Sequence, residues 1–378
     1  MKILGIETSC DETAAAVVED GVSILSNVVV SQIDIFAEYG GVIPEVAARS
    51  HLEVMMPVVD KALADAGCSW DEIDAIAVTH APGLLGSLLI GTLAARTLAI
   101  LHNKPLYAVH HLKSHVYANW LDTGRDSMLR SGARPAGPSP RATGATARAA
   151  ALRTPLRQSI ESRPPFPLLA LVISGGHTQI LYMPGHNQFE IIGTTRDDAV
   201  GECFDKVAKI LGLPYPGGPS IAKAALKGDP NKYKLPHPKI EGLDFSFSGL
   251  KTAVLRTVQK EVGVPISYPS HKLKELLTEQ QVADFAASFQ KTAVEILCEK
   301  LVKGLETYPE AQSVVVAGGV SANQVLREAL TEAYFPTPSL SGDNGAMVAA
   351  ACYFEIQNGV KPIDPYKLNI YPRISIEK

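Results

Sequence analysis

The fold of this chain is decided by two similar stretches, ILGIETSCDETAAAVV at residues 3–18 and LLALVISGGHTQILY at residues 168–182. Each stretch begins with an apolar run, passes through a short polar turn, and returns as a second run of apolar and small residues. Two runs of this kind on either side of a tight turn predict a β-hairpin. Because helical stretches separate the two hairpins, we expect a duplicated α/β architecture with one lobe per hairpin.

The remaining segments alternate helix and strand signals in the order that such lobes require. Helical spacing at residues 46–66 and 84–101 flanks a strand pattern at 73–79, and a long helix pattern at 280–303 precedes an apolar run at 313–317. Gly318 and Gly319 follow that last run, and a helix pattern begins at Gln324. A strand, a glycine pair and a helix in this order are typical of phosphate or nucleotide binding.

The division of the chain follows from these patterns. We predict an N-terminal lobe at residues 1–121, an inserted loop at 122–165, a C-terminal lobe at 166–345, and a C-terminal helix and tail at 346–378 that returns to the first lobe.

The composition indicates a packed protein of an ordinary class. Apolar residues make up 46% of the 378 positions and charged residues 20%, close to the globular average. The net charge of −4 provides no overall basic field, so any contact with nucleic acid must be local or shared with a partner. Five scattered cysteines without a C-x-x-C pair argue against a disulfide framework and indicate a reducing compartment.

Two regions bear on location. The chain runs from Met1 directly into a strand pattern, without an apolar or Arg-rich leader, which predicts a cytoplasmic protein. The apolar stretch at residues 84–101 is interrupted by glycines and by Arg96, and this suits a buried helix better than a membrane span.

The segment from residue 122 to 165 has a composition of its own. It contains eight Arg, no Lys, three acids, six Pro and eight Ala, without an aromatic residue. Such a stretch cannot form much core and is predicted to be a mobile inserted loop. Its local charge of about +5 could attract RNA phosphates; the alternative is a solvated linker without a role.

The sequence HLKSH at residues 111–115 places two imidazoles four residues apart. On a helix His111 and His115 share one face and can bind one cation, although such a pair is also a common structural pattern. Zinc proteases carry a glutamate as base directly after the first histidine. Leu112 stands there in this chain, so the metallopeptidase interpretation lacks its base.

A third ligand is offered by Asp343, in the polar turn SGDNGA before a helix pattern at residues 346–354. With the two histidines it would complete a His, His, Asp set that leaves open positions for substrate and suits iron(II) as readily as zinc. The alternative is that Asp343 only caps the helix.

Two further groups could carry chemistry. Asp11 and Glu12 in the first hairpin turn could face a bound phosphate or accept a proton, or could only cap the turn. The glycine pairs at residues 175–176, 217–218 and 318–319 offer backbone N–H groups without Cβ obstruction.

With these residues in view, the chain closely resembles the TsaD family of tRNA threonylcarbamoyl transferases, formerly labelled glycoproteases. The resemblance covers nearly all of the chain. The matching segments are GIETSCDETA (5–14), GGVIPEVAARSH (40–51), APGLLGSLLIG (81–91), VHHLKSH (109–115), VISGGHTQ (172–179), DDAVGECFDKVAK (197–209), YPGGPS (215–220), FSFSGLKTAV (245–254), GGVSAN (318–323) and DNGAM (343–347).

The resemblance implies a fold and a set of site residues. The fold would be ASKHA, the two-lobed architecture of actin and sugar kinases, with a cleft between the lobes. His111, His115 and Asp343 would hold one divalent metal, iron(II) or alternatively zinc. Asp11 would be the essential acid, assisted by Glu12. The threonylcarbamoyl adenylate would be bound by Val172, Ile173, Ser174, Gly175, Gly176, Asp205, Gly218 and Asn323.

The implied activity is the transfer of a threonylcarbamoyl group from threonylcarbamoyl-AMP to N6 of the adenosine 3′ to the anticodon, in tRNAs reading ANN codons, with release of AMP. The implied partners are tRNA, a paralogous TsaB-like ASKHA subunit, a TsaE-like ATPase subunit and an upstream adenylate-forming enzyme. Many relatives have Glu-Gly between the two histidines, whereas this chain has Lys113-Ser114. We therefore expect an altered charge near the metal.

Two other classes compete with this interpretation. A sugar or carboxylate kinase of the same fold would use the phosphate-binding turns for ATP, but it has no need of an H-x-x-x-H pair. A noncatalytic scaffold should have lost its site residues, whereas the three candidate ligands and the glycine-rich turns are all present here.

Overall fold

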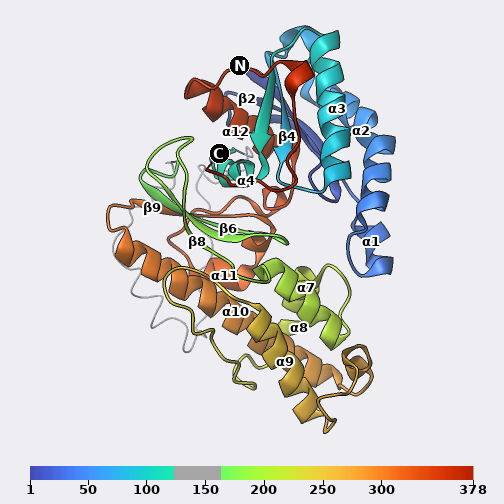
Figure 1. The fold of residues 1–378 in the computed structure, drawn as a ribbon, viewed down its shortest axis with the longest axis vertical. Helices are drawn as coiled ribbons and strands as arrows, with labels where there is room; N and C mark the ends of the chain where they lie inside the picture. The colour runs from blue at the N-terminus through green and yellow to red at the C-terminus, as the bar shows by residue number, and fades with distance from the viewer. Residues whose placement is uncertain (123–162, 378) are drawn as a thin grey trace, which may run out of the picture.

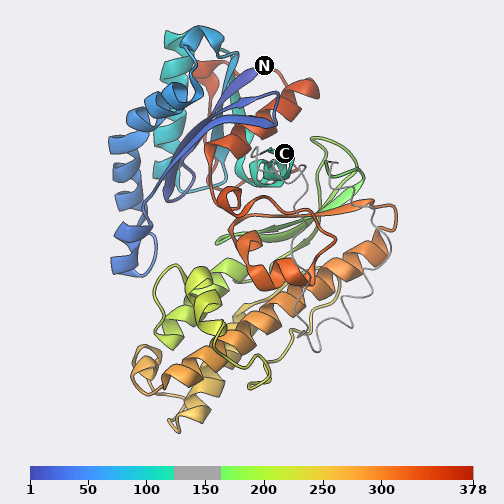
Figure 2. The ribbon, with the colours of Figure 1, turned by 180° about the vertical axis from the view of Figure 1, so that it is seen from behind.

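A computed structural model describes residues 1–122 and 163–377 of the chain. The protein has two lobes, each built on one mixed β-sheet with helices packed against it (Figures 1 and 2). Most of the Arg-rich stretch, residues 123–162, lies outside the described residues, and so do the predictions of a mobile loop and of RNA attraction made for it.

The N-terminal lobe contains a five-stranded sheet in the order β3-β2-β1-β4-β5. β1 pairs antiparallel with β2 and β2 with β3, while β1, β4 and β5 run parallel. The strands are β1 (Lys2–Glu7), β2 (Glu12–Glu19), β3 (Ser23–Ser31), β4 (Ala75–Ala81) and β5 (Leu106–His110).

Helices cover both faces of this sheet because its strands alternate two buried sets of side chains. Leu4 and Ile6 point toward α2 (Pro44–Ala66) and α3 (Leu85–Leu101), whereas Ile3 belongs to the opposite face. On that face lies α12 (Gly345–Gln357), drawn in red beside the blue strands in Figure 1. A Cβ atom on Gly5 would overlap the backbone of Gly345, so the two glycines permit direct contact of helix and sheet.

The C-terminal lobe repeats the order of the first four strands as β8-β7-β6-β9. β6 pairs antiparallel with β7 and parallel with β9. The strands are β6 (Leu168–Ile173), β7 (Thr178–Met183), β8 (Glu190–Thr194) and β9 (Ser313–Ala317). The helices are α7 (Val200–Leu211), α8 (Gly217–Ala225), α9 (Ser248–Glu261), α10 (Glu279–Thr307) and α11 (Gln324–Ala329). The predicted duplicated ASKHA-type α/β fold is confirmed.

A shared apolar core joins the lobes. Leu168, Ala170 and Val172 of β6 pack in one cluster with residues of α12 and of α4 (His111–Tyr117). α4 accordingly lies between the two sheets in both views (Figures 1 and 2). Side chains of α4 therefore lie close to both lobes.

The chain returns to the N-terminal lobe after α12 as an extended tail. The Asn369 carbonyl oxygen lies 3.1 Å from Nδ1 of His80, and the Tyr371 N–H donates to the His80 carbonyl oxygen at 3.0 Å. Further on, the Ile191 N–H of β8 donates to the Glu377 carboxylate at 2.9 Å. We call residues 369–377 the C-terminal strap, because they contact both lobes. The division at residues 121, 165 and 345 stays a proposal.

The predicted elements lie within a few residues of the observed ones, with the predicted strand 73–79 displaced to Ala75–Ala81. The short helix α1 (Ile33–Tyr39), the helices α8 and α9, and the strands β3 and β8 were not anticipated. The apolar stretch at 84–101 forms α3, and over residues 1–122 and 163–377 no helix has both the length and the apolar character that a bilayer span requires.

Candidate metal and transfer site

His111 and His115 stand on one face of α4, one turn apart, with ring centroids separated by 4.6 Å. α4 begins where β5 ends, so its first turn lies at the carboxyl edge of the parallel strands. The preceding His110 caps the helix, because its Nδ1 accepts a hydrogen bond from the Leu112 N–H at 3.2 Å. The local sequence thus assigns one histidine to capping and leaves two for a shared site.

Asp343 approaches both histidines from the turn before α12. Its Oδ1 lies 3.0 Å from Nε2 of His115 and 3.6 Å from Nε2 of His111. The helix cap is a different residue: the Asn344 side chain accepts a hydrogen bond from the Met347 N–H at 2.9 Å. The alternative that Asp343 merely caps α12 is therefore wrong, and its carboxylate is free for the shared site.

Glu7, at the end of β1, orients His111 from behind. Its carboxylate oxygen Oε2 lies 3.1 Å from Nδ1 of His111 and accepts a hydrogen bond from the Thr79 hydroxyl at 2.5 Å. A carboxylate on Nδ1 directs the Nε2 lone pair outward, which is the usual arrangement behind a metal-binding histidine. Glu7 is fully buried, so this orientation is held inside the lobe.

The three side chains fit a divalent cation. One ligand atom from each lies within 4.8 Å of the others. Both ring nitrogens of His115 are buried without a hydrogen bond, although Nε2 is close to Asp343. A buried imidazole nitrogen without a partner is rare and costly, and a metal ion would satisfy it. Two nitrogens and one carboxylate oxygen suit iron(II) or zinc.

The electrostatics favour positive charge at this point. Burial would lower the pKa of His111, but the charges of Asp343 and Glu7 raise it to about 9. Burial would raise the pKa of Asp343, but the neighbouring histidines His111 and His115 hold it below its usual range. Two carboxylates in a buried site thus create a strong preference for a cation.

The first hairpin turn carries Asp11 and Glu12 beside this site. Burial, and then the charges of Asp343 and Asp11, raise the pKa of Glu12 well above its ordinary value. Its Oε1 accepts a hydrogen bond from the Ser31 hydroxyl at 3.3 Å. The surroundings of Glu12 therefore favour its neutral form.

His51 of α2 holds the same turn in place by hydrogen bonds. Its Nε2 lies 2.9 Å from the Cys10 carbonyl oxygen, which can only accept, so Nε2 carries the proton. Nδ1 then accepts from the Thr13 hydroxyl at 2.7 Å. The Ser87 hydroxyl of α3 also donates to the Cys10 carbonyl, at 3.2 Å. The backbone before Asp11 is thus fixed by two helices.

The second hairpin turn is closed by its own residues. The Ser174 N–H donates to the His177 carbonyl oxygen at 2.8 Å, and the His177 N–H donates to the Ser174 hydroxyl at 3.2 Å. Gly175 and Gly176 are exposed, and no atom lies within 4 Å of where a Cβ would stand. Val172 and Ile173 are fully buried in the core, so neither side chain is open to a ligand.

Asp205, Gly218 and Asn323 lie on the C-terminal lobe in different settings. The Asp205 carboxylate accepts a hydrogen bond from the Gly217 N–H at 2.6 Å, and burial raises its pKa. Space opens around the Cβ position of Gly218. The Asn323 side chain is already occupied, because it caps α11 through the Leu326 N–H at 3.2 Å and donates to Gln290 at 2.9 Å.

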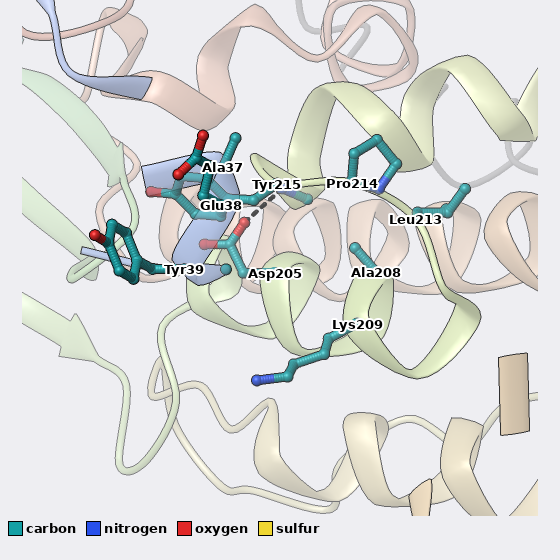
Figure 3. Close-up of a pocket in the computed structure, with 11 residues that line it drawn as sticks. Ala37, Glu38, Tyr39, Asp205, Ala208, Lys209, Leu213, Pro214 and Tyr215 are labelled. Carbon is teal, nitrogen blue, oxygen red and sulfur yellow. Dashed lines mark hydrogen bonds between the residues drawn. The ribbon is translucent and has the colours of Figure 1, made fainter. Parts of the chain in front are cut away.

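Asp205 faces a cavity of about 220 Å³ between the lobes. Figure 3 shows Glu38 and Tyr39, from the end of α1, on the side of this cavity opposite α7, with Tyr215 beside Asp205. The charge of Asp11 raises the pKa of both Asp205 and Tyr215, after the larger effect of burial. Asp11 thus acts electrostatically across the interface between the lobes.

Comparison with known proteins decides the family. The family model described as tRNA N6-adenosine threonylcarbamoyltransferase matches residues 23–135 and 148–350. A protein of that name from Symbiobacterium thermophilum is 46% identical over 95% of this chain and 93% of its own length. One from Thermomicrobium roseum is 44% identical over 96% of this chain and 93% of its own. The chain belongs to the TsaD family.

Membership in the TsaD family makes this chain a tRNA-modifying transferase, as its motifs predicted. Among solved structures, the activator of 2-hydroxyisocaproyl-CoA dehydratase from Clostridium difficile aligns with 96% of this chain and 100% of its own. Its TM-score is 0.46 and its identity 14%, so the family assignment rests on the sequence relatives alone.

The Lys113 of this TsaD-family chain does not face the metal residues. Its Nζ lies 3.5 Å from Oδ1 of Asn187 and 4.0 Å from Oε1 of Glu355, and it stands 5.3 Å from the centre of the Phe189 ring. Asn187 and Phe189 come from the C-terminal lobe, whereas Glu355 belongs to α12. The ammonium group of Lys113, whose charge we expected near the metal, lies instead in the contact between the two lobes.

Three groups of the site were missed by sequence reasoning. Glu7 could have been found, because a carboxylate in an apolar strand is rarely buried without a purpose. His51 gave no signal beyond its place in a helix pattern. His177 was quoted only as part of a turn, yet burial, followed by the charges of His111 and His115, lowers its pKa to about 4. It therefore lies within electrostatic reach of the metal residues.

Proposed function

We propose that this chain transfers the threonylcarbamoyl group from threonylcarbamoyl-AMP to N6 of the adenosine 3′ to the anticodon in tRNAs reading ANN codons, releasing AMP. The observation that carries this proposal is the convergence of His111, His115 and Asp343 beside the two hairpin turns in a chain of the TsaD family. One turn presents an acid and the other presents open backbone N–H groups, which are the two kinds of group that acyl transfer needs.

His111, His115 and Asp343 would hold one divalent metal, iron(II) or alternatively zinc. When bound, the ion supplies Lewis-acid stabilisation of negative charge on a carbonyl or phosphoryl oxygen. The 3.0 Å approach of His115 Nε2 to Asp343 and the carboxylate of Glu7 behind His111 support this assignment. The family implies the metal, and the choice between the two ions is our proposal.

The donor would lie along the second turn. Backbone N–H groups of the Ser174–Gly176 segment and the backbone of Val172 and Ile173 would bind its phosphoryl and carbonyl oxygens. Asp205 would accept hydrogen bonds from the ribose hydroxyls, and Gly218 would allow close approach. Asn323 would act mainly by shaping the loop, because both ends of its side chain already have partners.

Asp11 would serve the acceptor. In the transfer, a bond forms between the adenosine N6 and the carbamoyl carbon, the bond from that carbon to the phosphate oxygen breaks, and one proton leaves N6. We assign Asp11 one of two roles: it is the base that accepts this proton, or it is the group that orients the amine for attack. Glu12, whose neutral form is favoured by its surroundings, would assist as a hydrogen-bond donor.

The implied partners remain part of this proposal: a TsaB-like paralogous subunit, a TsaE-like ATPase subunit and an adenylate-forming enzyme, acting in the cytoplasm. The outer faces of α2 and α3 support docking of a protein subunit. They expose several large apolar side chains, namely Leu52, Met56, Leu85, Leu89 and Leu93.

The proposal is tested by incorporation of labelled threonine into unmodified tRNA, with purified chain, threonylcarbamoyl-AMP and the partner subunits. We compare the parent with His111→Ala and Asp11→Asn, and with His271→Ala and Asp71→Asn as controls, since these two residues are exposed and lie outside the site. We expect loss of incorporation of at least about a hundredfold in the first pair, as for removal of a group essential to an acyl transfer, and parent activity in the controls. A folded, metal-loaded parent without transfer would refute the proposal.

A further inference from the structure

A second cavity lies between the N-terminal lobe, the second hairpin turn and the C-terminal strap. It has a volume of about 620 Å³ and is lined by Pro82 and Gly83, by His177, and by residues 372–375 of the C-terminal strap. It shares no lining residue with the cavity at Asp205. A volume of this size is within the range of sites for small molecules and nucleotides.

The wall formed by the strap is fixed in place. The Gly83 N–H donates to the Pro372 carbonyl oxygen at 3.3 Å, and Nε2 of His110 lies 3.4 Å from the Ile374 carbonyl oxygen. Ile376, the next residue but one, is buried. Because His110 directly precedes the metal residue His111, the strap and the metal residues are held to the same short segment.

The charge of this cavity differs from that of the first. The cavity at Asp205 has two acids, Asp205 and Glu38, among its lining residues. The second cavity has no acid in its lining, and its one permanent cation is Arg373. Within the described residues, Arg373 is exposed and makes no ion pair or hydrogen bond. An unpaired guanidinium at the rim of a nucleotide-sized cavity is suited to a phosphate.

The second hairpin turn reaches this cavity through His177. Gly175 and Gly176 directly precede His177, which closes the turn by two hydrogen bonds with Ser174. A donor held by the glycines and a second ligand beside His177 would therefore meet near His111, His115 and Asp343. A transfer reaction needs two substrates that approach one centre from different directions.

We propose that this second cavity receives the acceptor nucleoside of the tRNA, and that Arg373 binds a backbone phosphate next to it. This inference rests on the proposed function. The ligand chemistry, a phosphate ester, is shared by the tRNA backbone and by the adenylate donor. The donor is the less suitable occupant, because neither the glycines of the turn nor Asp205 lines this cavity.

The test uses Arg373→Gln, with Lys367→Gln as a matched control on the same tail, where the lysine is exposed and 4.0 Å from Asp364. The full chain is titrated with a fluorescent anticodon stem-loop RNA over a series of salt concentrations. We expect the Kd of Arg373→Gln to rise about tenfold, as for loss of one charged hydrogen bond. The dependence of log Kd on log salt should become shallower by about 0.7 to 0.9. The control should match the parent.

Two further readouts are needed. One distinguishes a phosphate of the tRNA from the phosphate of the adenylate donor, and the other tests this inference independently of the proposed transfer activity. AMP affinity, measured by calorimetry, should be unchanged in Arg373→Gln; a loss there instead of in RNA binding would give the cavity to the donor and overturn the proposal. Unchanged RNA binding, equal loss in the control, or no RNA binding by the parent would also overturn it. RNA binding needs no transfer, so failure of the transfer assay alone would refute only the proposed activity.

Discussion

The turn between β1 and β2 and the turn between β6 and β7 occupy equivalent places in the two lobes, but they are held in opposite ways. The first is clamped from outside: Thr8 donates to the Ser87 carbonyl at 2.8 Å, the Leu84 N–H donates to the Ser9 carbonyl at 2.8 Å, and His51 fixes Cys10. The second is closed by hydrogen bonds between Ser174 and His177, with Gly201 of α7 packed against Ser174 and Gly175, and its two glycines are exposed.

This difference shows how a duplicated scaffold can serve two tasks. A turn that must hold acidic side chains against a metal site requires many external contacts, since the charges repel one another. A turn that offers backbone N–H groups to an incoming ligand requires open space and few neighbours. The contrast predicts that changes at the first turn damage stability and activity together, whereas changes at the second damage ligand binding alone.

The largest effect should come from Glu7→Ala. The substitution leaves three donors without their acceptor, namely the Ser9 N–H, the Thr79 hydroxyl and His111. We expect a loss of about 3–5 kcal/mol in the free energy of unfolding and a metal affinity lower by about ten- to a hundredfold. Ser174→Ala, which removes one hydrogen bond from the second turn, should cost about 1 kcal/mol. Urea unfolding measures the free energy of unfolding of both variants, and metal analysis measures their metal affinity. Equal losses of unfolding free energy in Glu7→Ala and Ser174→Ala would contradict the contrast between the two turns.

A pair of glycines provides the next test. A Cβ on Gly83 would stand 2.6 Å from the Ser9 carbonyl oxygen, whereas one on Gly175 would meet nothing within 4 Å. Gly83→Ala should therefore lower the unfolding free energy by about 1–3 kcal/mol, while Gly175→Ala should stay within about 0.5 kcal/mol of the parent. Calorimetry should show weaker AMP binding in Gly175→Ala despite its normal stability. A destabilised Gly175→Ala would show that the second turn is also clamped.

The smallest effect concerns acid. Burial lowers the pKa of His51, partly offset by its hydrogen bond to Cys10. As the pH falls through about 6.5, His51 binds a proton in the unfolded chain but not in the folded chain. The free energy of unfolding therefore decreases below that pH, by at most about 1.4 kcal/mol per pH unit. His51→Gln should show a shallower loss over the same range in thermal melts. An identical pH dependence in parent and variant would remove His51 from this account.

Sequence patterns predicted the scaffold well because both hairpins carry an uninterrupted apolar signal. β6 and β9 have the predicted bounds, and α3 begins one residue after its predicted start. β3 was missed because Ser26 and Asn27 interrupt its apolar alternation, and α1 was missed because a helix of seven residues is too short for periodicity to be read.

The candidate site could be predicted only in its parts. The spacing of His111 and His115 indicated a shared face, and Asp343 was named as the third ligand from its polar turn, with helix capping as the alternative. No local pattern could show that α12 packs against β1 and α4. This packing places Asp343, in the turn before α12, beside the histidines. The support by Glu7 and His51 depends in the same way on contacts between distant segments, and hence on packing of the whole lobe.

The place of α12 also has a consequence for biosynthesis. The face of the first sheet that carries Ile3 and Gly5 is covered by a helix encoded near the end of the message. A ribosome adding about 5–20 residues per second needs on the order of 20–70 s to travel from β1 to α12. Throughout that interval the nascent N-terminal lobe exposes an apolar sheet face, so this chain is a natural client for chaperones that bind unfinished polypeptides.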